Sequence, residues 1–221
     1  MLYPETVKRE TFELLIALMH DEMLADFHLA GGTALALYLG HRMSIDLDLF
    51  TPVEFDALEL ESHMIEKYNF QTSLKRYINT LKGYIGDVKI DCIAHKYECV
   101  GPVYHTKEGI RLYSMKDIAA MKLSAVADNG TRLKDFIDVA CLSTKMSLSD
   151  MLNAYKDKYP DANAITPYKG LTYFVDINFN EPVVMINGTY KREFLEKRLR
   201  NMVNRENSLF YGFPIIKEGK K

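Results

Sequence analysis

Cysteine is scarce in this chain, and Trp is absent. The 221 residues include three cysteines, Cys92, Cys99 and Cys141, which are odd in number and show no CxxC spacing. This usage excludes a disulfide scaffold and fits a protein of the reducing cytoplasm. We therefore expect the three cysteines to be small buried hydrophobic residues.

Long apolar runs and a strong excess of one charge are also lacking. The longest apolar run, residues 29–39, is interrupted by Gly31, Gly32 and Thr33, so it falls short of the ~18 residues that a membrane span needs. The first ten residues show no basic-then-apolar order, so we expect no signal peptide, a cytoplasmic protein and no membrane partner. With 28 Lys and Arg against 30 Asp and Glu, and 48% hydrophobic residues, the composition is typical of a globular protein.

The near-neutral total hides a basic C-terminal segment. From Tyr190 onward the chain has nine basic and four acidic residues, a net charge of +5, so the remaining chain carries −7. A basic helix in this segment could bind a polyanion such as RNA. The simpler interpretation is a solvated helix face with mixed charges.

The hydrophobic pattern predicts strands early in the chain and helices late. In the first part we expect helices at 6–23, 33–39 and 54–68, and strands at 27–30, 44–50, 70–77, 80–85 and 88–94. After a strand-like segment at 110–113, the predicted helices are 115–127, 134–145, 148–158, 165–175 and 190–204. This order predicts an α+β fold with a core at residues 1–114 and a helical C-terminal part at residues 115–221.

The clearest predicted strand, residues 44–50, carries two carboxylates. Its alternation puts Ile45, Leu47 and Leu49 on one face and places Asp46 and Asp48 on the other, with Cα atoms about 6.7 Å apart. Carboxylates this close repel each other, so they need open water or a cation between them. Two hard oxygen ligands on one rigid strand are well suited to Mg²⁺.

Asp91 follows the same rule in the strand predicted at 88–94. It alternates with the apolar residues Ile90 and Cys92, so it also points away from a buried face. If the two acidic strands are neighbours, their carboxylates can converge on the open side of the sheet, where a pair of metal ions about 4 Å apart could lie. For each aspartate alone, a solvated strand face is the simpler interpretation.

A glycine corner precedes the acidic strand. Gly31, Gly32 and Thr33 join a predicted strand to a predicted helix, and the free N–H groups and positive dipole end of a helix N-terminus favour phosphate. Two glycines can also mark only a tight corner. Combined with the carboxylates, however, the corner supplies both halves of a nucleoside triphosphate site.

One lysine, Lys122, lies at the centre of the apolar face of the helix predicted at 115–127. Lysine is rarely buried without an anionic partner, because desolvating an ammonium group is costly. An antiparallel hairpin about Gly130 would bring Asp138 level with Lys122 and Asp135 one turn away. Two interpretations stay open: a structural Lys122–Asp138 ion pair with Asp135 complementing the helix N-terminus, or a lysine that both carboxylates orient toward a triphosphate.

The Gly-Gly corner, Asp-x-Asp and a later Asp between apolar residues resemble the DNA polymerase beta-like nucleotidyltransferase superfamily. Within it, LAGGTALALYLGHRMSIDLDLF, MKLSAVADNGTRLKDFIDVACL and YKGLTYFVD resemble the AbiEii/AbiGii toxin family, the nucleotidyltransferase halves of abortive-infection toxin-antitoxin pairs. The resemblance spans residues 27–176. One departure is Gly32, where many superfamily members have Ser, so a hydroxyl contact to phosphate must come from Thr33 or be absent.

The resemblance implies a polymerase beta-like core with a mixed sheet, and a helical part that completes the active-site cleft. It implies Mg²⁺- or Mn²⁺-dependent transfer of a nucleoside monophosphate from an NTP to an acceptor hydroxyl. The expected metal ligands are Asp46, Asp48 and Asp91, which with Lys122 and Asp138 form the expected catalytic set. The expected nucleotide-binding residues are Gly31, Gly32, Thr33, Arg42, Ser44, Lys122, Lys134 and Asp135.

The resemblance further implies an RNA acceptor, particularly a tRNA acceptor end, or a protein hydroxyl, and a cognate antitoxin as a partner. Two other functions stay open: the same chemistry on a small-molecule hydroxyl, as in antibiotic nucleotidyltransferases, and a nucleotide-binding module without turnover. The six histidines show no paired metal-ligand spacing, and no role is assigned to them. The sequence contains no Walker, GxSxG or HExxH motif, so it gives no support to a P-loop or hydrolase function.

Overall fold

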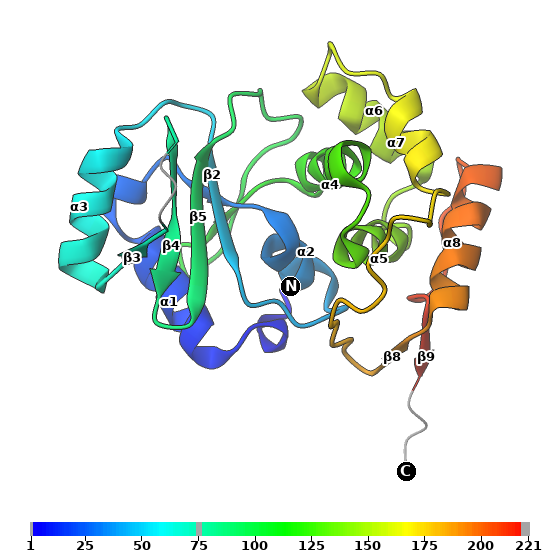
Figure 1. Ribbon diagram of the computed structural model, residues 1–221, viewed down its shortest axis with the longest axis horizontal. Coiled ribbons are helices and arrows are strands. Elements are labelled where there is room, and N and C mark those ends of the chain that lie inside the picture. Colours follow the sequence, from blue (N-terminus) through cyan, green and yellow to red (C-terminus); the bar gives the residue numbers. More distant parts are fainter. Residues whose placement is uncertain (1, 74–76, 218–221) are drawn as a thin grey trace.

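The computed structural model describes residues 2–73 and 77–217 (Figure 1). Its helices are α1 (Arg9–Met19), α2 (Gly31–Leu39), α3 (Ala57–Tyr68), α4 (Met115–Asn129), α5 (Leu133–Leu142), α6 (Leu148–Lys158), α7 (Ile165–Gly170) and α8 (Arg192–Asn204), with short 3-10 turns η1 (Pro4–Thr6) and η2 (Glu22–Leu24). Its strands are β1 (His28–Leu29), β2 (Leu47–Thr51), β3 (Gln71–Thr72), β4 (Thr80–Ile85), β5 (Val88–Ala94), β6 (Tyr104–His105), β7 (Arg111–Leu112), β8 (Gly188–Tyr190) and β9 (Ile215–Lys217). The predicted order of early strands and late helices is confirmed.

The early strands form one mixed sheet. Its strand order is β3-β4-β5-β2-β1-β7-β6. Strand β2 runs antiparallel to β1 and parallel to β5, and β5 pairs antiparallel with β4. In Figure 1, α3 lies at one side of the sheet and α4 to α8 at the other, and α2 packs against β2, α4 and α5. The acidic strands therefore lie side by side in the interior of the sheet.

Helix α2 begins at the glycine corner and ends at the glycine that the sequence predicted. Gly31 has a φ of 64° and Gly40 a φ of 67°, a left-handed conformation that costs little only for glycine. Between them, Ala34, Leu35 and Leu37 are fully buried. Both ends of α2 are thus marked by left-handed glycines. Because the glycine corner is the first turn of this helix, the position of α2 fixes the position of the corner.

The strand predicted at 44–50 is shorter than expected, and this prediction was wrong at its N-terminal end. β2 begins at Leu47, and Ile45 is 52% exposed instead of sharing the buried face of Leu47. The Ser44 N–H donates to the Thr6 carbonyl, and the Asp46 carbonyl accepts a hydrogen bond from the Thr33 hydroxyl. The segment is thus held by η1 and α2, not by a sheet ladder.

Other predicted boundaries were also wrong, among them those of the helices predicted at 54–68, 134–145 and 190–204, which are observed as α3, α5 and α8. The helix predicted at 6–23 is restricted to α1, because Lys8 is extended and the Asp21 carboxylate caps the separate turn η2. The helix predicted at 165–175 ends at Gly170, after which the chain continues in turns. The strand predicted at 70–77 is confined to β3 within the described residues, and residues 74–76 lie outside them. Cys92 and Cys141 are buried as predicted, whereas Cys99 is exposed in the loop after β5.

One hydrophobic core extends across both predicted parts of the chain. At their junction, Lys158 at the end of α6 is fully buried, and its Nζ lies 2.8 Å from Oδ1 of Asp117 on α4. The same ammonium group donates to the Glu98 carbonyl at 3.1 Å. This buried ion pair therefore joins α6, α4 and the loop after β5. In the described residues, no helix is long and apolar enough to cross a membrane.

We expect Lys158→Met to lower the free energy of unfolding by about 3–5 kcal/mol, because it leaves the Asp117 carboxylate buried without its cation. Urea unfolding followed by circular dichroism measures the change. Lys156→Met, exposed on the same helix, is the control and should change stability by less than about 0.5 kcal/mol. A loss below about 1 kcal/mol for Lys158→Met would contradict the structural role of the pair.

Candidate active site

Asp48 and Asp91 are direct neighbours on the parallel strands β2 and β5. Adjacent strands lie about 4.8 Å apart, and paired residues project from the same face of a sheet. The predicted convergence of these two strands is therefore confirmed. On the other side of Asp91, Lys82 of β4 is its paired residue. The row Lys82, Asp91 and Asp48 thus crosses three strands.

Asp91 does not lie on an open face, as the sequence had suggested. It is only 5% exposed, because Lys82 and Lys89 cover it: their Nζ atoms lie 3.1 and 2.9 Å from its Oδ2. Its Oδ1 is buried and has no hydrogen-bond partner. The alternation rule gave the correct face of the strand, but it could not show that lysines fill that face.

Asp48 is held in an unfavourable environment for a charged carboxylate. Burial raises its pKa, and the negative charges of Asp91 and Asp46 raise it further, whereas Lys122 and Lys89 act in the opposite direction. The carboxylate lies directly against the glycine corner, since a Cβ atom at Gly31 would lie 1.9 Å from Oδ2 of Asp48. The corner and the acidic strand are therefore in contact.

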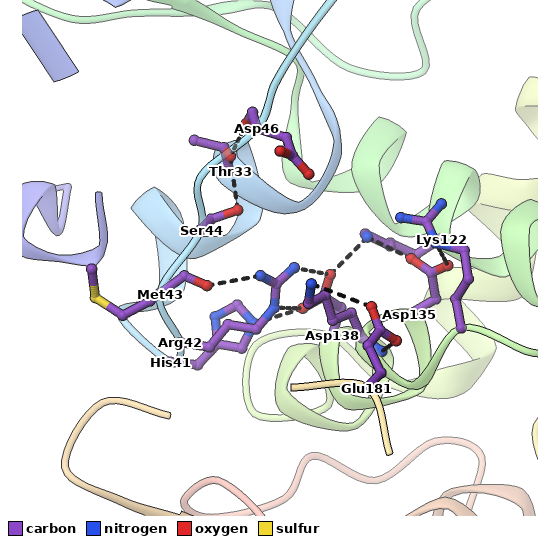
Figure 2. Close-up of polar contacts among 12 residues, drawn as sticks. Thr33, His41, Arg42, Met43, Ser44, Asp46, Lys122, Asp135, Asp138 and Glu181 are labelled. Carbon is purple, nitrogen blue, oxygen red and sulfur yellow. Dashed lines mark hydrogen bonds and ion pairs between the residues drawn. The ribbon is translucent and has the colours of Figure 1, made fainter. Parts of the chain in front are cut away.

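Asp46 lies before the strand, in the segment that Thr33 holds (Figure 2). The Thr33 hydroxyl is buried; it contacts the Asp46 carbonyl and lies 2.8 Å from the Ser44 hydroxyl. Both hydroxyls thus stabilise the turn leading to the strand. The charge of Asp46 still acts on Asp48 and on Lys89.

Lys122 is buried among carboxylates, as the helical wheel predicted. It is 6% exposed, and its Nζ lies 2.7 Å from Oδ1 of Asp135 and 2.7 Å from Oδ2 of Asp138 (Figure 2). Burial alone would lower the pKa of Lys122, but the two carboxylates raise it, so the ammonium stays charged. Asp135 does not merely complement the helix N-terminus, because it binds Lys122 directly.

Two residues of the loop after α2 complete the environment of Asp138. Arg42 binds it with two hydrogen bonds, from Nε at 2.7 Å to Oδ1 and from Nη2 at 2.8 Å to Oδ2, and the His41 Nε2 lies 2.8 Å from Oδ1. Burial would raise the pKa of Asp138, but Arg42 and Lys122 hold it well below its usual value. The sequence reasoning missed His41, and no motif or spacing pointed to it.

The presence of glycine at position 32, where many superfamily members have serine, has a structural reason. A Cβ atom at this position would lie 2.4 Å from Nη2 of Arg42, so the guanidinium occupies the space that a serine side chain would need. Arg42 itself is buried, and its third nitrogen, Nη1, donates to the Met43 carbonyl. No side chain caps the first turn of α2, so the backbone N–H groups of the corner keep their capacity to bind an anion.

One predicted site residue, Lys134, lies outside the cluster around Asp138. Lys134 pairs with Glu181, with 3.3 Å between Nζ and Oε1, and is partly exposed. Of the basic residues on α8, Arg198 donates to the Ser143 hydroxyl and to the Gly212 carbonyl, so its charge serves internal packing.

The paired carboxylates of Asp48 and Asp91, here called the acidic row, have the chemistry of a divalent cation site. Its donors are hard carboxylate oxygens, one of which, Oδ1 of Asp91, is buried without a partner, and Asp48 is destabilised by like charges. Among the described residues, no three His, Cys, Asp or Glu side chains are grouped closely enough to hold a metal ion. The carboxylates of Asp48 and Asp91 fit a cation, and a third ligand requires a side chain such as that of Asp46 to approach.

Comparisons with known proteins identify the family and the fold of the chain. The family model described as "Nucleotidyl transferase AbiEii toxin, Type IV TA system" matches residues 13–100 and 98–208. The uncharacterized protein aq_aa25 from Aquifex aeolicus (strain VF5) is 34% identical over 175 residues, which cover 77% of this chain and 84% of that protein.

Two solved structures share the fold. MenT4, a nucleotidyltransferase toxin from Mycobacterium tuberculosis H37Rv, has a TM-score of 0.55 at 14% identity, covering 92% of this chain and 87% of MenT4. JHP933 from Helicobacter pylori has a TM-score of 0.54 at 19% identity, covering 91% of this chain and 93% of JHP933.

The mixed sheet has the polymerase beta-like fold that MenT4 shares, and the family model shows that the class is that of the nucleotidyltransferases. Within that class, the chain belongs to the AbiEii nucleotidyltransferase toxin family. The family and the fold expected from the sequence motifs are thereby confirmed.

Gly31→Ala is expected to lower the free energy of unfolding by about 2 kcal/mol more than Gly86→Ala. Gly86 is a matched control, because its φ of 56° is close to that of Gly31 and nothing lies within 4 Å of a Cβ atom placed there. Both variants carry the strain of a left-handed alanine, but only Gly31→Ala must displace Asp48. Equal losses in urea unfolding would show that the corner does not press on the carboxylate.

Asp138→Asn is expected to lower the free energy of unfolding at pH 7 by about 3 kcal/mol, because it disrupts a buried charge network. The pKa of Asp138 is lower when folded, so its contribution is present above the unfolded-state value of about 3.9 and is lost as pH falls below it. The variant should therefore lose less stability than the wild type on acidification. Urea unfolding at several pH values tests this, with Asp157→Asn, exposed on α6, as the control. Parallel pH profiles for the wild type and Asp138→Asn would contradict it.

Proposed function

We propose that this protein transfers a nucleoside monophosphate from an NTP to a hydroxyl group of an RNA acceptor, and that it is the toxin of a toxin-antitoxin pair. The observation that carries the proposal is the contact between the acidic row and the glycine corner. There, a carboxylate suited to a cation lies against backbone N–H groups suited to phosphate.

The chain's own residues would orient the triphosphate. The first-turn N–H groups of Gly31 and Gly32 would bind its outer phosphates, with the positive end of the α2 dipole behind them. Lys122 would add positive charge toward Asp48, on which its charge already acts. Asp138 and Asp135 would keep Lys122 charged and in place.

Asp48, Asp91 and Asp46 would hold Mg²⁺ or Mn²⁺. Divalent cations at such a site neutralise the charge that accumulates on the leaving pyrophosphate and lower the pKa of an attacking hydroxyl. Asp91 would also accept the proton of the acceptor hydroxyl; its Oδ1 carries no other hydrogen bond.

The basic outer surface of α8 supports an RNA acceptor. Arg192, Lys197 and Arg200 are exposed there, although Glu196 pairs with both arginines. The toxin assignment is supported by the family, which is described as part of a toxin-antitoxin system. By that description, a cognate antitoxin would be the protein partner, and a cytoplasmic location would follow from an RNA acceptor.

The test is transfer from each α-labelled NTP, with and without Mg²⁺, to three separate acceptor fractions: total RNA, total protein and small molecules. We expect label to enter RNA only when Mg²⁺ is present. Label in the protein fraction or in the small-molecule fraction would show that the acceptor is a protein or a small molecule and not RNA. Mg²⁺-dependent thermal stabilisation by NTP without labelled product in any fraction would favour a binding module and reject the transferase proposal.

Asp48→Asn is expected to reduce transfer at least about 100-fold while raising the melting temperature by a few degrees. The rise is expected because the substitution removes a carboxylate that burial and like charges destabilise. Asp87→Asn, exposed in the turn between β4 and β5, is the control and should leave both quantities unchanged. Transfer retained in Asp48→Asn would reject the role of the acidic row.

A further inference from the structure

The two lysines on Asp91 have no place in the proposed transfer reaction. Lys82 and Lys89 both bind Oδ2 of Asp91, at 3.1 and 2.9 Å, and leave Oδ1 buried without a partner. An unpaired carboxylate oxygen in a buried site is costly. The arrangement therefore leaves one oxygen of the Asp91 carboxylate without a partner to compensate it.

The strand pairing shows which residues surround this carboxylate. Lys82 is opposite Asp91 on β4, Lys89 precedes Asp91 by two residues on the same face, and Asp48 is opposite Asp91 on β2. Lys82 thus flanks the carboxylate from β4 and Lys89 flanks it from along β5, whereas Asp48 flanks it from β2. A cation shared by Asp48 and Asp91 must share the Asp91 carboxylate with two ammonium groups.

We propose that Lys82 and Lys89 take the place of a divalent cation at Asp91 in the metal-free protein and compete with that cation for the carboxylate. This inference rests on the proposed metal-dependent function, and it adds two residues that set the affinity of the metal site. In the structure, both ammonium groups already engage the Asp91 carboxylate.

The lysines can leave without any movement of the backbone. Their side chains are 37% and 39% exposed, and long lysine stems keep an ammonium group in solvent at little cost. Each ammonium is also compact and strongly hydrated, unlike an arginine fork, so it is readily exchanged for water. Cation binding would therefore replace two weakly held charges with one ion that is shared with Asp48.

The test is calorimetric titration of Mn²⁺ into the wild type, Lys82→Met, Lys89→Met and the double variant. Methionine keeps the length of the stem and removes the charge. We expect the double variant to bind Mn²⁺ about tenfold more tightly than the wild type, and each single variant about threefold more tightly. In the absence of metal, the double variant should melt at a lower temperature, because Asp91 has lost both partners, and Mn²⁺ should raise its melting temperature more than that of the wild type.

Two controls separate this effect from a general change in charge. Lys96→Met removes one charge from an exposed lysine that pairs with Glu54, and Lys89→Arg keeps the charge at the site. Lys96→Met should bind Mn²⁺ within about twofold of the wild type. Lys89→Arg should bind Mn²⁺ no more tightly than the wild type, because an arginine fork leaves a carboxylate less readily than an ammonium group does. The single variants each keep one lysine on Asp91, so they give a result even if the double variant does not fold.

The outcomes distinguish this inference from the proposed function. If the wild type binds Mn²⁺ and Lys82→Met, Lys89→Met and the double variant bind it equally or more weakly, the competition is rejected and the metal site stands. If neither the wild type nor any variant binds Mn²⁺, the metal dependence of the proposed function is rejected together with the competition. A tightening by Lys96→Met as large as that by Lys89→Met would also overturn the inference.

Discussion

The burial of several carboxylates is the constraint on which the rest of this structure depends. Asp91, Asp135 and Asp138 are buried, and Asp48 and Asp46 are partly buried. Charges so placed are tolerated only when cations or hydrogen bonds compensate them. Here the cations come from segments far apart in sequence: the loop after α2, helix α4 and strands β4 and β5. The charge pairing and the tertiary fold therefore determine each other.

The carboxylates are compensated to different degrees, and the difference separates structural from reactive groups. Asp138 receives two hydrogen bonds from Arg42, one contact from His41 and one from Lys122, and its pKa is held low. Asp48 has no comparable set, and its pKa is raised. Fully paired groups of the first kind hold the architecture, whereas incompletely paired groups of the second kind are suited to bind something that the chain does not supply.

Lys122 belongs to both groups, so the two interpretations of this residue are compatible. Its short contacts with Asp135 and Asp138 make it a structural cation. Its charge also opposes the rise in the pKa of Asp48 that burial causes, so its field reaches the acidic row. A lysine held charged by two carboxylates on one side can thus act on the other side without changing its own position. That arrangement is a form of electrostatic preorganisation.

Sequence patterns predicted those parts of the site that depend on local periodicity. Alternation gave β4 and β5 their observed bounds and placed Asp91 on the correct face, and the helical wheel identified Lys122 as buried. The start of β2 could not be predicted, because hydrogen bonds from distant residues hold the segment before Leu47 away from the sheet. The cover of Asp91 was missed for a similar reason, since Lys82 reaches it from another strand. The start of β2 and the cover of Asp91 both depend on tertiary contacts, which sequence periodicity does not reveal.

The same limit applies to the glycine corner, where the structure gives the sequence departure a physical meaning. Gly32 leaves the space that the Arg42 guanidinium fills, and this guanidinium is fixed by Asp138 on α5. The corner therefore has no side-chain hydroxyl to offer a phosphate, because the Thr33 hydroxyl is engaged in the turn. What remains is a set of backbone N–H groups with a buried cation directly behind them. Such a corner would recognise phosphate by charge and backbone geometry alone, and its shape depends on the same buried carboxylate that holds Lys122.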